Sequence, residues 1–246
     1  MEKVFLNKNN VLDSEGIYAM RFYTLGVPHD VVIDDYLPLK DGKTMFSNPG
    51  TDGSIWTAIL EKAFAKYHGN YSHIVGGWPG EAVRTLTGAP YETIKHKQIS
   101  VDDLWERLSL YDGSNAILMA GSADGSDKDT NAEGVVLGHA YTVLGVKKLS
   151  NGVRLVKLRN PWGTDSYHGD WSDKSSLWTP ELRKEAGAVD ANDGIVHMTV
   201  EYFQANFEST DFIEDASKMF AGYYLKLNDN AQTDPTNGIF CKKAGC

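Results

Sequence analysis

The stretch that decides the fold is GHAYTVLGVKKLSNGVRLVKLRNPWG, residues 138–163. It contains two runs rich in aliphatic and β-branched residues, 140–146 and 153–159, which are joined through Ser150-Asn151-Gly152. Asn-Gly between two such runs is typical of a tight turn, so the stretch predicts an antiparallel β-hairpin. His139 begins the outgoing strand and Asn160 follows the returning one. Antiparallel pairing therefore brings these two side chains to the same end of the sheet.

A histidine beside an asparagine amide is an arrangement suited to a thiol protease. The thiolate of such an enzyme needs an imidazolium that stabilises it and later protonates the leaving amine, and the ring needs an orienting partner that does not titrate. We expect Asn160 Oδ1 to accept the Nδ1 proton of His139, which directs Nε2 at the thiol. Trp162 is placed to keep water off that bond. The alternatives are a histidine packed in the core and an asparagine that only makes a turn before Pro161.

Length and composition exclude several classes of protein. The chain has 246 residues, 41% of them hydrophobic, which is enough for one large domain or two modest ones. A formal charge of −9, without a stripe of Lys and Arg, argues against nucleic acid as a partner. No apolar run approaches the roughly 18 residues of a membrane span, and the start lacks the pattern of a secretory signal. The two cysteines, Cys241 and Cys246, make no disulfide framework, so we expect a cytoplasmic protein without a membrane span.

Two expected strands and a helix precede the hairpin. Residues 16–26 and 29–39 each carry a short β-type run bounded by Gly and Pro. In 52–68 the apolar residues fall on one face at helical spacing, and Ser54 is the expected N-cap. The following stretch, 71–92, is rich in glycine and turn residues, which indicates a subdomain junction near residue 92.

The second part of the chain is expected to be rich in β-structure. A helix should begin after Ser100, which has capping-box spacing to Asp103, and a buried strand is expected at 115–121. The polar loop 123–134 is a candidate lid in front of His139. Beyond the hairpin we expect a short helix within 169–187, a strand-to-helix transition within 197–207, a closing strand at 219–227 and an aperiodic tail at 229–246.

Eight segments together resemble the calpain family of intracellular cysteine proteases, in the order and with the spacing of that family. They are GIYAMRFYTLG, DVVIDDYLPLKDGK, SIWTAILEKAFAKYHGNYSHIVGG, LTGAPYE, GHAYTVLG, LRNPWG, GDWSD and DGIVHM. The resemblance implies a papain-like α+β fold. Residues 1–92 would form part of the first protease subdomain, 93–228 a complete, antiparallel β-rich second subdomain, and 229–246 a tail.

The resemblance also assigns roles to four residues of the quoted stretch. His139 is implied to be the general base and acid, and Asn160 its orienting partner. Trp162 is implied to shield the pair and to line the substrate groove. Gly138 is expected to let a substrate backbone pass close to the ring.

The departures from the family concern the nucleophile and calcium. The catalytic cysteine of calpains lies in a Gln-Gly-x-x-Gly-Asp-Cys-Trp segment several dozen residues before the point that matches Gly16, so we expect this chain to lack it. Neither Cys241 nor Cys246 precedes an apolar helix that would activate a thiol. Of the calcium ligands implied by the family, the acidic positions correspond to Ser54, Ser166 and Ile195, while Asp173 and Asp193 remain as vestigial candidates. We therefore expect weak or absent calcium binding, and no other metal site among His29, His68, His73, His96, His168 and His197.

Two functions remain open from the sequence. In the first, the chain is part of a calpain-like endopeptidase core that cleaves exposed protein segments by a Cys-His-Asn mechanism and is inactive without the cysteine-bearing segment. In the second, it is a catalytically inactive calpain-homology module that binds or scaffolds other proteins in a larger assembly. In both, we expect either a partner chain that covers the apolar surface left by the absent segment, or poor solubility of the chain alone.

Overall fold

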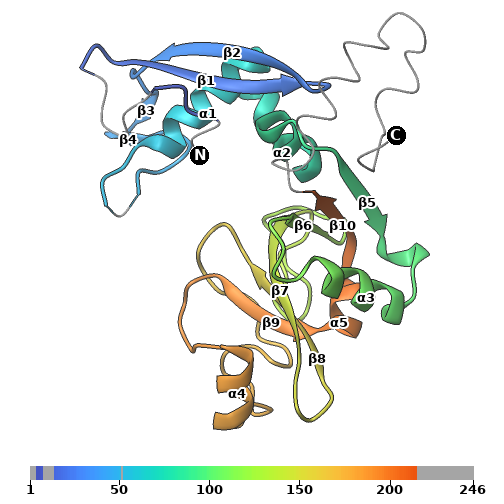
Figure 1. Ribbon diagram of the computed structural model, residues 1–246. Helices are drawn as coiled ribbons and strands as arrows, with labels where there is room; N and C mark the ends of the chain where they lie inside the picture. Colours follow the sequence, from blue (N-terminus) through green and yellow to red (C-terminus); the bar gives the residue numbers. More distant parts are fainter. Residues whose placement is uncertain (1–3, 8–13, 51, 215–246) are drawn as a thin grey trace, which may run out of the picture. The chain divides into compact units, whose positions relative to one another are not determined.

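A computed structural model of the chain describes residues 4–7, 14–50 and 52–214. Within them the chain forms two compact units, the first ending at Pro90 and the second beginning at Tyr91 (Figure 1). The strand expected at 219–227 and the tail expected at 229–246 lie outside the described residues. Among the described residues no helix is both long and apolar enough to cross a membrane.

The first unit is built on a two-stranded antiparallel sheet that packs against a helix. Strands β1 (Ile17–Thr24) and β2 (Val27–Asp34) form a hairpin, and helix α1 (Trp56–Tyr67) lies against it. The buried side chains of the sheet alternate along β1, as one covered face requires. The cluster they form with α1 consists of Tyr18, Met20, Phe22, Ile33, Ile59 and Ala63.

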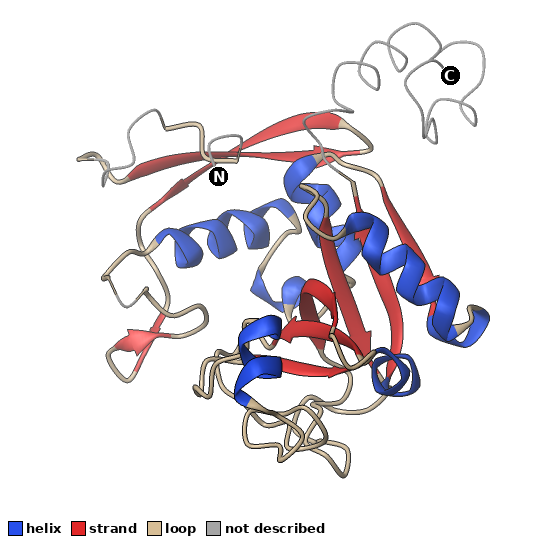
Figure 2. Ribbon diagram, turned by 60° about the horizontal axis from the view of Figure 1, so that its bottom comes forward, coloured by secondary structure: helices blue, strands red, loops and turns tan. Residues whose placement is uncertain are grey.

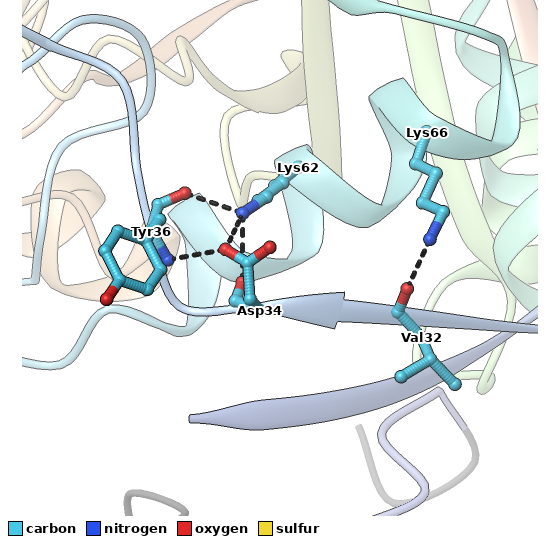
Figure 3. Close-up of polar contacts among 5 residues, drawn as sticks. All are labelled: Val32, Asp34, Tyr36, Lys62 and Lys66. Carbon is cyan, nitrogen blue, oxygen red and sulfur yellow. Dashed lines mark hydrogen bonds and ion pairs between the residues drawn. The ribbon is translucent and has the colours of Figure 1, made fainter. Parts of the chain in front are cut away.

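Two lysines of α1 bind the outer edge of β2. Lys66 donates from Nζ to the carbonyl oxygen of Val32 at 2.7 Å, and Lys62 donates to the carbonyl oxygens of Asp34 and Tyr36 at 3.1 and 2.6 Å. Lys62 also forms an ion pair with the Asp34 carboxylate (Figure 3). These contacts satisfy edge carbonyls that would otherwise be open to another strand.

The start of α1 differs from the expectation. The N-cap residue is Ile55, which makes no side-chain capping bond, so the expected cap at Ser54 is wrong. Ser54 belongs to the preceding loop, where its N–H donates to Asp52 Oδ1 at 2.9 Å and its carbonyl oxygen accepts from Gly50 at 2.7 Å. These contacts hold Ser54 in the loop, one residue before the N-cap Ile55.

The glycine-rich stretch after α1 contains a helix that the sequence analysis did not predict. Helix α2 (Pro79–Thr87) begins with proline in its first turn, carries Glu81 there, and ends at Gly88 in the left-handed conformation. Those are ordinary start and stop signals for a helix. The smaller elements of the unit are β3 (Leu39–Lys40), β4 (Lys43–Thr44) and the 3-10 turn η1 (Tyr71–Ile74).

The second unit contains a six-stranded antiparallel sheet with the order β5-β10-β6-β7-β8-β9. This confirms the expected α+β class with an antiparallel second part. The outer strand β5 and the inner strand β10, which pair with each other, were not predicted. The strands are β5 (Tyr91–Lys95), β6 (Ile117–Ser122), β7 (Ala140–Lys148), β8 (Arg154–Arg159), β9 (Ile195–Thr199) and β10 (Phe207–Ile213).

Two helices supply side chains to the main core of this unit. They are α3 (Val101–Tyr111) and α5 (Val200–Asn206). Figure 2 shows the helices in blue and the strands in red. The expected Ser100 cap is confirmed, since Ser100 Oγ accepts from the N–H of Asp103 at 3.1 Å. The expected strand-to-helix transition is confirmed where β9 leads into α5. The buried core includes Leu104, Leu108, Leu118, Tyr141, Val143, Val156, Leu158, Met198, Phe203 and Phe212.

The predicted hairpin is present as β7 and β8, with an irregularity in its pairing between Val143 and Gly145. Its far end is covered by a second cluster of buried residues. Trp171 packs there with Leu149 and Leu155, and Trp178 packs against the same cluster. Both indoles thus pack on the hairpin. The short helix α4 (Pro180–Ala186), with the 3-10 turn η2 (His96–Gln98), completes the unit.

Candidate active site

His139 directly precedes β7, and its backbone is held by Ser122 at the end of β6. The Ser122 hydroxyl accepts the His139 N–H at 2.9 Å and donates to the His139 carbonyl oxygen at 3.1 Å. The Ser122 N–H donates to that same carbonyl oxygen at 2.9 Å. Ser122 lies 17 residues before His139 in the sequence, and the sequence analysis did not identify it. Three hydrogen bonds from one residue therefore fix the main chain that carries the imidazole.

The side chains of His139 and Asn160 meet, as the hairpin predicts. His139 Nε2 lies 3.0 Å from Asn160 Oδ1, and Asn160 is only 2% exposed. The nitrogen that makes this contact is the opposite of the one expected, so the expected Nδ1 contact is wrong. Nε2 is the ring nitrogen farther from the main chain, and it reaches the neighbouring strand. Because Oδ1 can only accept, the pairing places the proton of a neutral ring on Nε2 and leaves Nδ1 as the acceptor.

The orientation of the Asn160 amide is set by a second donor. The Trp162 N–H donates to Asn160 Oδ1 at 3.1 Å, so this oxygen faces two N–H groups. The Asn160 main chain is also bound, since its N–H donates to Gly194 and its carbonyl oxygen accepts from Gly163. The oxygen of the amide, rather than its NH₂ group, therefore faces His139.

Two aromatic rings enclose the imidazole. The Trp162 ring centroid lies 4.5 Å from that of His139 at an interplanar angle of 50°, and the Tyr141 ring lies 5.1 Å away, edge to face. Trp162 is 53% exposed, so its indole forms an outer wall beside the buried amide. The Tyr141 hydroxyl accepts the N–H of Val136 at 3.0 Å, which ties this ring to the preceding loop. Tyr141 was not among the expected site residues.

Gly138 is required by the backbone next to His139. Its φ is +52°, and a Cβ atom at this position would lie 2.3 Å from the carbonyl oxygen of Gly125. Its N–H donates to the carbonyl oxygen of Ala123 at 2.8 Å. A larger residue would therefore push the β6–β7 loop away from the site. The expected approach of a substrate backbone at Gly138 stays a prediction.

The polar loop before His139 is fastened to helix α5. Asn131 Nδ2 donates to the Tyr202 hydroxyl and to Asn206 Oδ1, both at 3.0 Å. Asn131 Oδ1 accepts the N–H groups of Glu133 and Val135 at 3.1 and 2.9 Å. The half-buried amide of Asn131 thus organises the loop and joins it to residues more than 70 positions later in the chain.

The comparisons with known proteins agree with this geometry. The family model described as calpain family cysteine protease matches residues 1–214. The chain belongs to the calpain family. It is 36% identical over 206 residues to the calpain-type cysteine protease ADL1 of rice, 34% over 199 residues to mouse calpain-12, and 36% over 203 residues to the mouse calpain-1 catalytic subunit. These matches cover 80%, 79% and 78% of the chain but 10%, 28% and 28% of the three calpains, so the chain spans a small part of their length.

The acidic residues of this calpain domain are engaged by backbone N–H groups. Asp173 Oδ2 accepts from Ala191 and Asp193 Oδ1 from Ile195, both at 2.9 Å, and Asp165 Oδ1 accepts from Gly194 at 2.7 Å. Burial raises the pKa of Asp165 and of Asp173, and neighbouring carboxylates raise both further.

Weak or absent calcium binding stays a prediction, and the donors of the described residues support it. In the described part of the chain, no group of three or more His, Cys, Asp or Glu side chains is arranged to hold a metal ion. Calcium requires six or more oxygen ligands, several of them charged. In this unit Ser166 and Ile195 supply no carboxylate at the positions that the resemblance implies. Ser54 supplies none at the position implied for a separate site in the first unit.

Proposed function

We propose that this chain is part of a cysteine-type endopeptidase in which His139 is the general base and acid and Asn160 orients its ring. The supporting observation is the 3.0 Å contact between His139 Nε2 and Asn160 Oδ1, made by an asparagine that is 2% exposed. A neutral amide holds the ring without competing for its proton. Trp162 covers the pair from the solvent side, which strengthens that hydrogen bond.

The proposed reaction uses the free nitrogen of the imidazole. His139 Nδ1 takes the proton of a cysteine thiol, and the thiolate attacks the peptide carbonyl carbon to form a tetrahedral intermediate. The protonated ring then gives its Nδ1 proton to the leaving amine as the C–N bond breaks. Water, deprotonated by the same nitrogen, hydrolyses the resulting thioester and restores the thiol. The Nε2–H bond to Asn160 is kept throughout.

The proposal requires a thiol that the described residues do not contain. The cysteines of the sequence, Cys241 and Cys246, lie outside the described residues, and no Gly-Asp-Cys-Trp segment occurs among the 246 residues. We propose that a further segment of the same calpain supplies the thiol. The substrates would then be exposed segments of other proteins inside the cell. Their cleavage would not require calcium bound at Asp173 and Asp193.

A second candidate function is a non-catalytic calpain-homology module in a larger assembly. The same missing Gly-Asp-Cys-Trp segment favours it, together with Ser54, Ser166 and Ile195 at positions where the resemblance expects carboxylates. In this case His139 and Asn160 would have a structural role only, because Asn160 is buried and organises the end of β8.

Labelling of the full-length protein with a peptidyl epoxide separates the two functions, because the probe traps activated thiols. For the protease we expect labelling of one cysteine, reduced by about 10²-fold or more in His139→Ala, since general base catalysis is lost. His168→Ala is the matched control, because this exposed histidine lies in the same unit, and it should label like the wild type. An absence of labelling with and without calcium would contradict the protease and support the module.

A further inference from the structure

The main chain of Asn160 is hydrogen-bonded to the segment from Ala191 to Ile195. The Asn160 N–H donates to the carbonyl oxygen of Gly194 at 2.8 Å. Gly194 has a φ of +81°, and a Cβ atom there would lie 2.7 Å from the Asn160 carbonyl oxygen. The two main chains are therefore in direct contact. Any displacement of Gly194 moves the residue that orients His139.

Asp165 holds this segment from the other side. Its Oδ1 accepts the Gly194 N–H at 2.7 Å, and its own N–H donates to Asn192 Oδ1 at 2.7 Å. Gly194 is thus bound through its N–H by Asp165 and through its carbonyl oxygen by Asn160. The contacts run from the Asp165 carboxylate through the main chain of Gly194 to Asn160, and from the Asn160 amide to His139 Nε2.

We propose that Asp165 is a positioning residue for the His139–Asn160 pair, acting through its hydrogen bond to Gly194. This inference rests on the proposed protease function for its catalytic meaning, whereas its structural content is independent of the thiol. Asp165 is adjacent to Ser166, the position where the family resemblance expects a calcium ligand.

Asp165 could act on the site through its hydrogen bond to Gly194 or through its negative charge, and substitutions distinguish the two. Asp165→Asn removes the negative charge but keeps an Oδ1 acceptor for the Gly194 N–H. Asp165→Ala removes both. Asp190→Ala removes an exposed carboxylate that acts on Asp173 in the same acidic group, and it leaves the Gly194 bond in place. Positioning by hydrogen bonding therefore predicts a wild-type site in Asp165→Asn and Asp190→Ala, and a disturbed one in Asp165→Ala.

The test reads the protonation pattern of the His139 ring by long-range ¹H–¹⁵N correlation on the ¹⁵N-labelled chain. The His139 signals are identified by their loss in His139→Gln. At a pH where the ring is neutral, we expect the wild type to carry the proton on Nε2, because Asn160 Oδ1 accepts from this nitrogen. In Asp165→Ala the ring should become a mixture of both tautomers, while Asp165→Asn and Asp190→Ala keep the Nε2–H form.

Each result bears on the inference separately from the protease. An unchanged Nε2–H form in Asp165→Ala, with wild-type urea unfolding as evidence that it folds, would overturn it. A tautomer mixture in Asp190→Ala or Asp165→Asn would overturn it too, because charge would then be the cause. Should Asp165→Ala fail to fold, the same measurement on Asp165→Leu decides, because leucine also removes the acceptor but fills the space of the carboxylate. An absence of epoxide labelling, combined with the expected tautomers, refutes the protease and leaves the positioning role standing.

Discussion

The Ser122 hydroxyl binds both main-chain polar groups of His139: it accepts the N–H at 2.9 Å and donates to the carbonyl oxygen at 3.1 Å. Ser122→Ala leaves the His139 N–H without its acceptor, and we expect the free energy of unfolding to fall by about 1–2 kcal/mol. Urea unfolding measures this change. Ser176→Ala, at an exposed serine of the same unit, is the control and should change little. A wild-type midpoint for Ser122→Ala would show that the bond does not hold the strand end.

The lysines of α1 allow a graded test of how the edge of β2 is held. Lys66 donates to one carbonyl oxygen, whereas Lys62 donates to two and pairs with Asp34 (Figure 3). Lys66→Met keeps the apolar stem and should lower the free energy of unfolding by about 1 kcal/mol. Lys62→Met should lower the urea midpoint further. Equal midpoints for the two variants would contradict a role of the carbonyl contacts.

The hairpin could be predicted because its signals are local. Asn151-Gly152 and the flanking runs define β7 and β8, and antiparallel pairing then brings His139 to Asn160. Helix α2 also carried local signals in Pro79 and Gly88, but the neighbouring glycines obscured them.

Other features depend on contacts between distant residues. Strand β5 pairs with β10 across more than 100 positions, so no sequence window contains both. Ser122 and Asp165 act on the site through backbone groups, which the identity of the contacted residue does not reveal. The choice between Nδ1 and Nε2 depends on the rotamer of His139, which the hairpin register leaves open.

We expect calcium to add no stability to the second unit at Asp173 and Asp193, since no group of three or more His, Cys, Asp or Glu side chains in the described residues is arranged to hold a metal ion. We expect thermal unfolding in 1 mM calcium and in excess chelator to agree within about 0.4 kcal/mol, the linkage value when the ligand concentration equals Kd. A larger rise with calcium that disappears in Asp173→Asn would contradict this expectation. That variant keeps an acceptor for the Ala191 N–H, so it is a fair control.

His197 should make the second unit sensitive to acid. It is 3% exposed, and neither ring nitrogen has a hydrogen-bond partner in the described part of the chain. Burial, with Lys157 and Arg183 nearby, lowers its pKa to about 4, although Asp193 acts in the opposite direction. The unfolded chain binds this proton near pH 6.5, so stability is lost as pH falls from about 6.5 to about 4, by roughly 3 kcal/mol in total. His197→Phe should remove that loss in urea unfolding followed against pH, whereas His168→Gln, at an exposed histidine, should keep it. An unchanged pH dependence in His197→Phe would refute the assignment to His197.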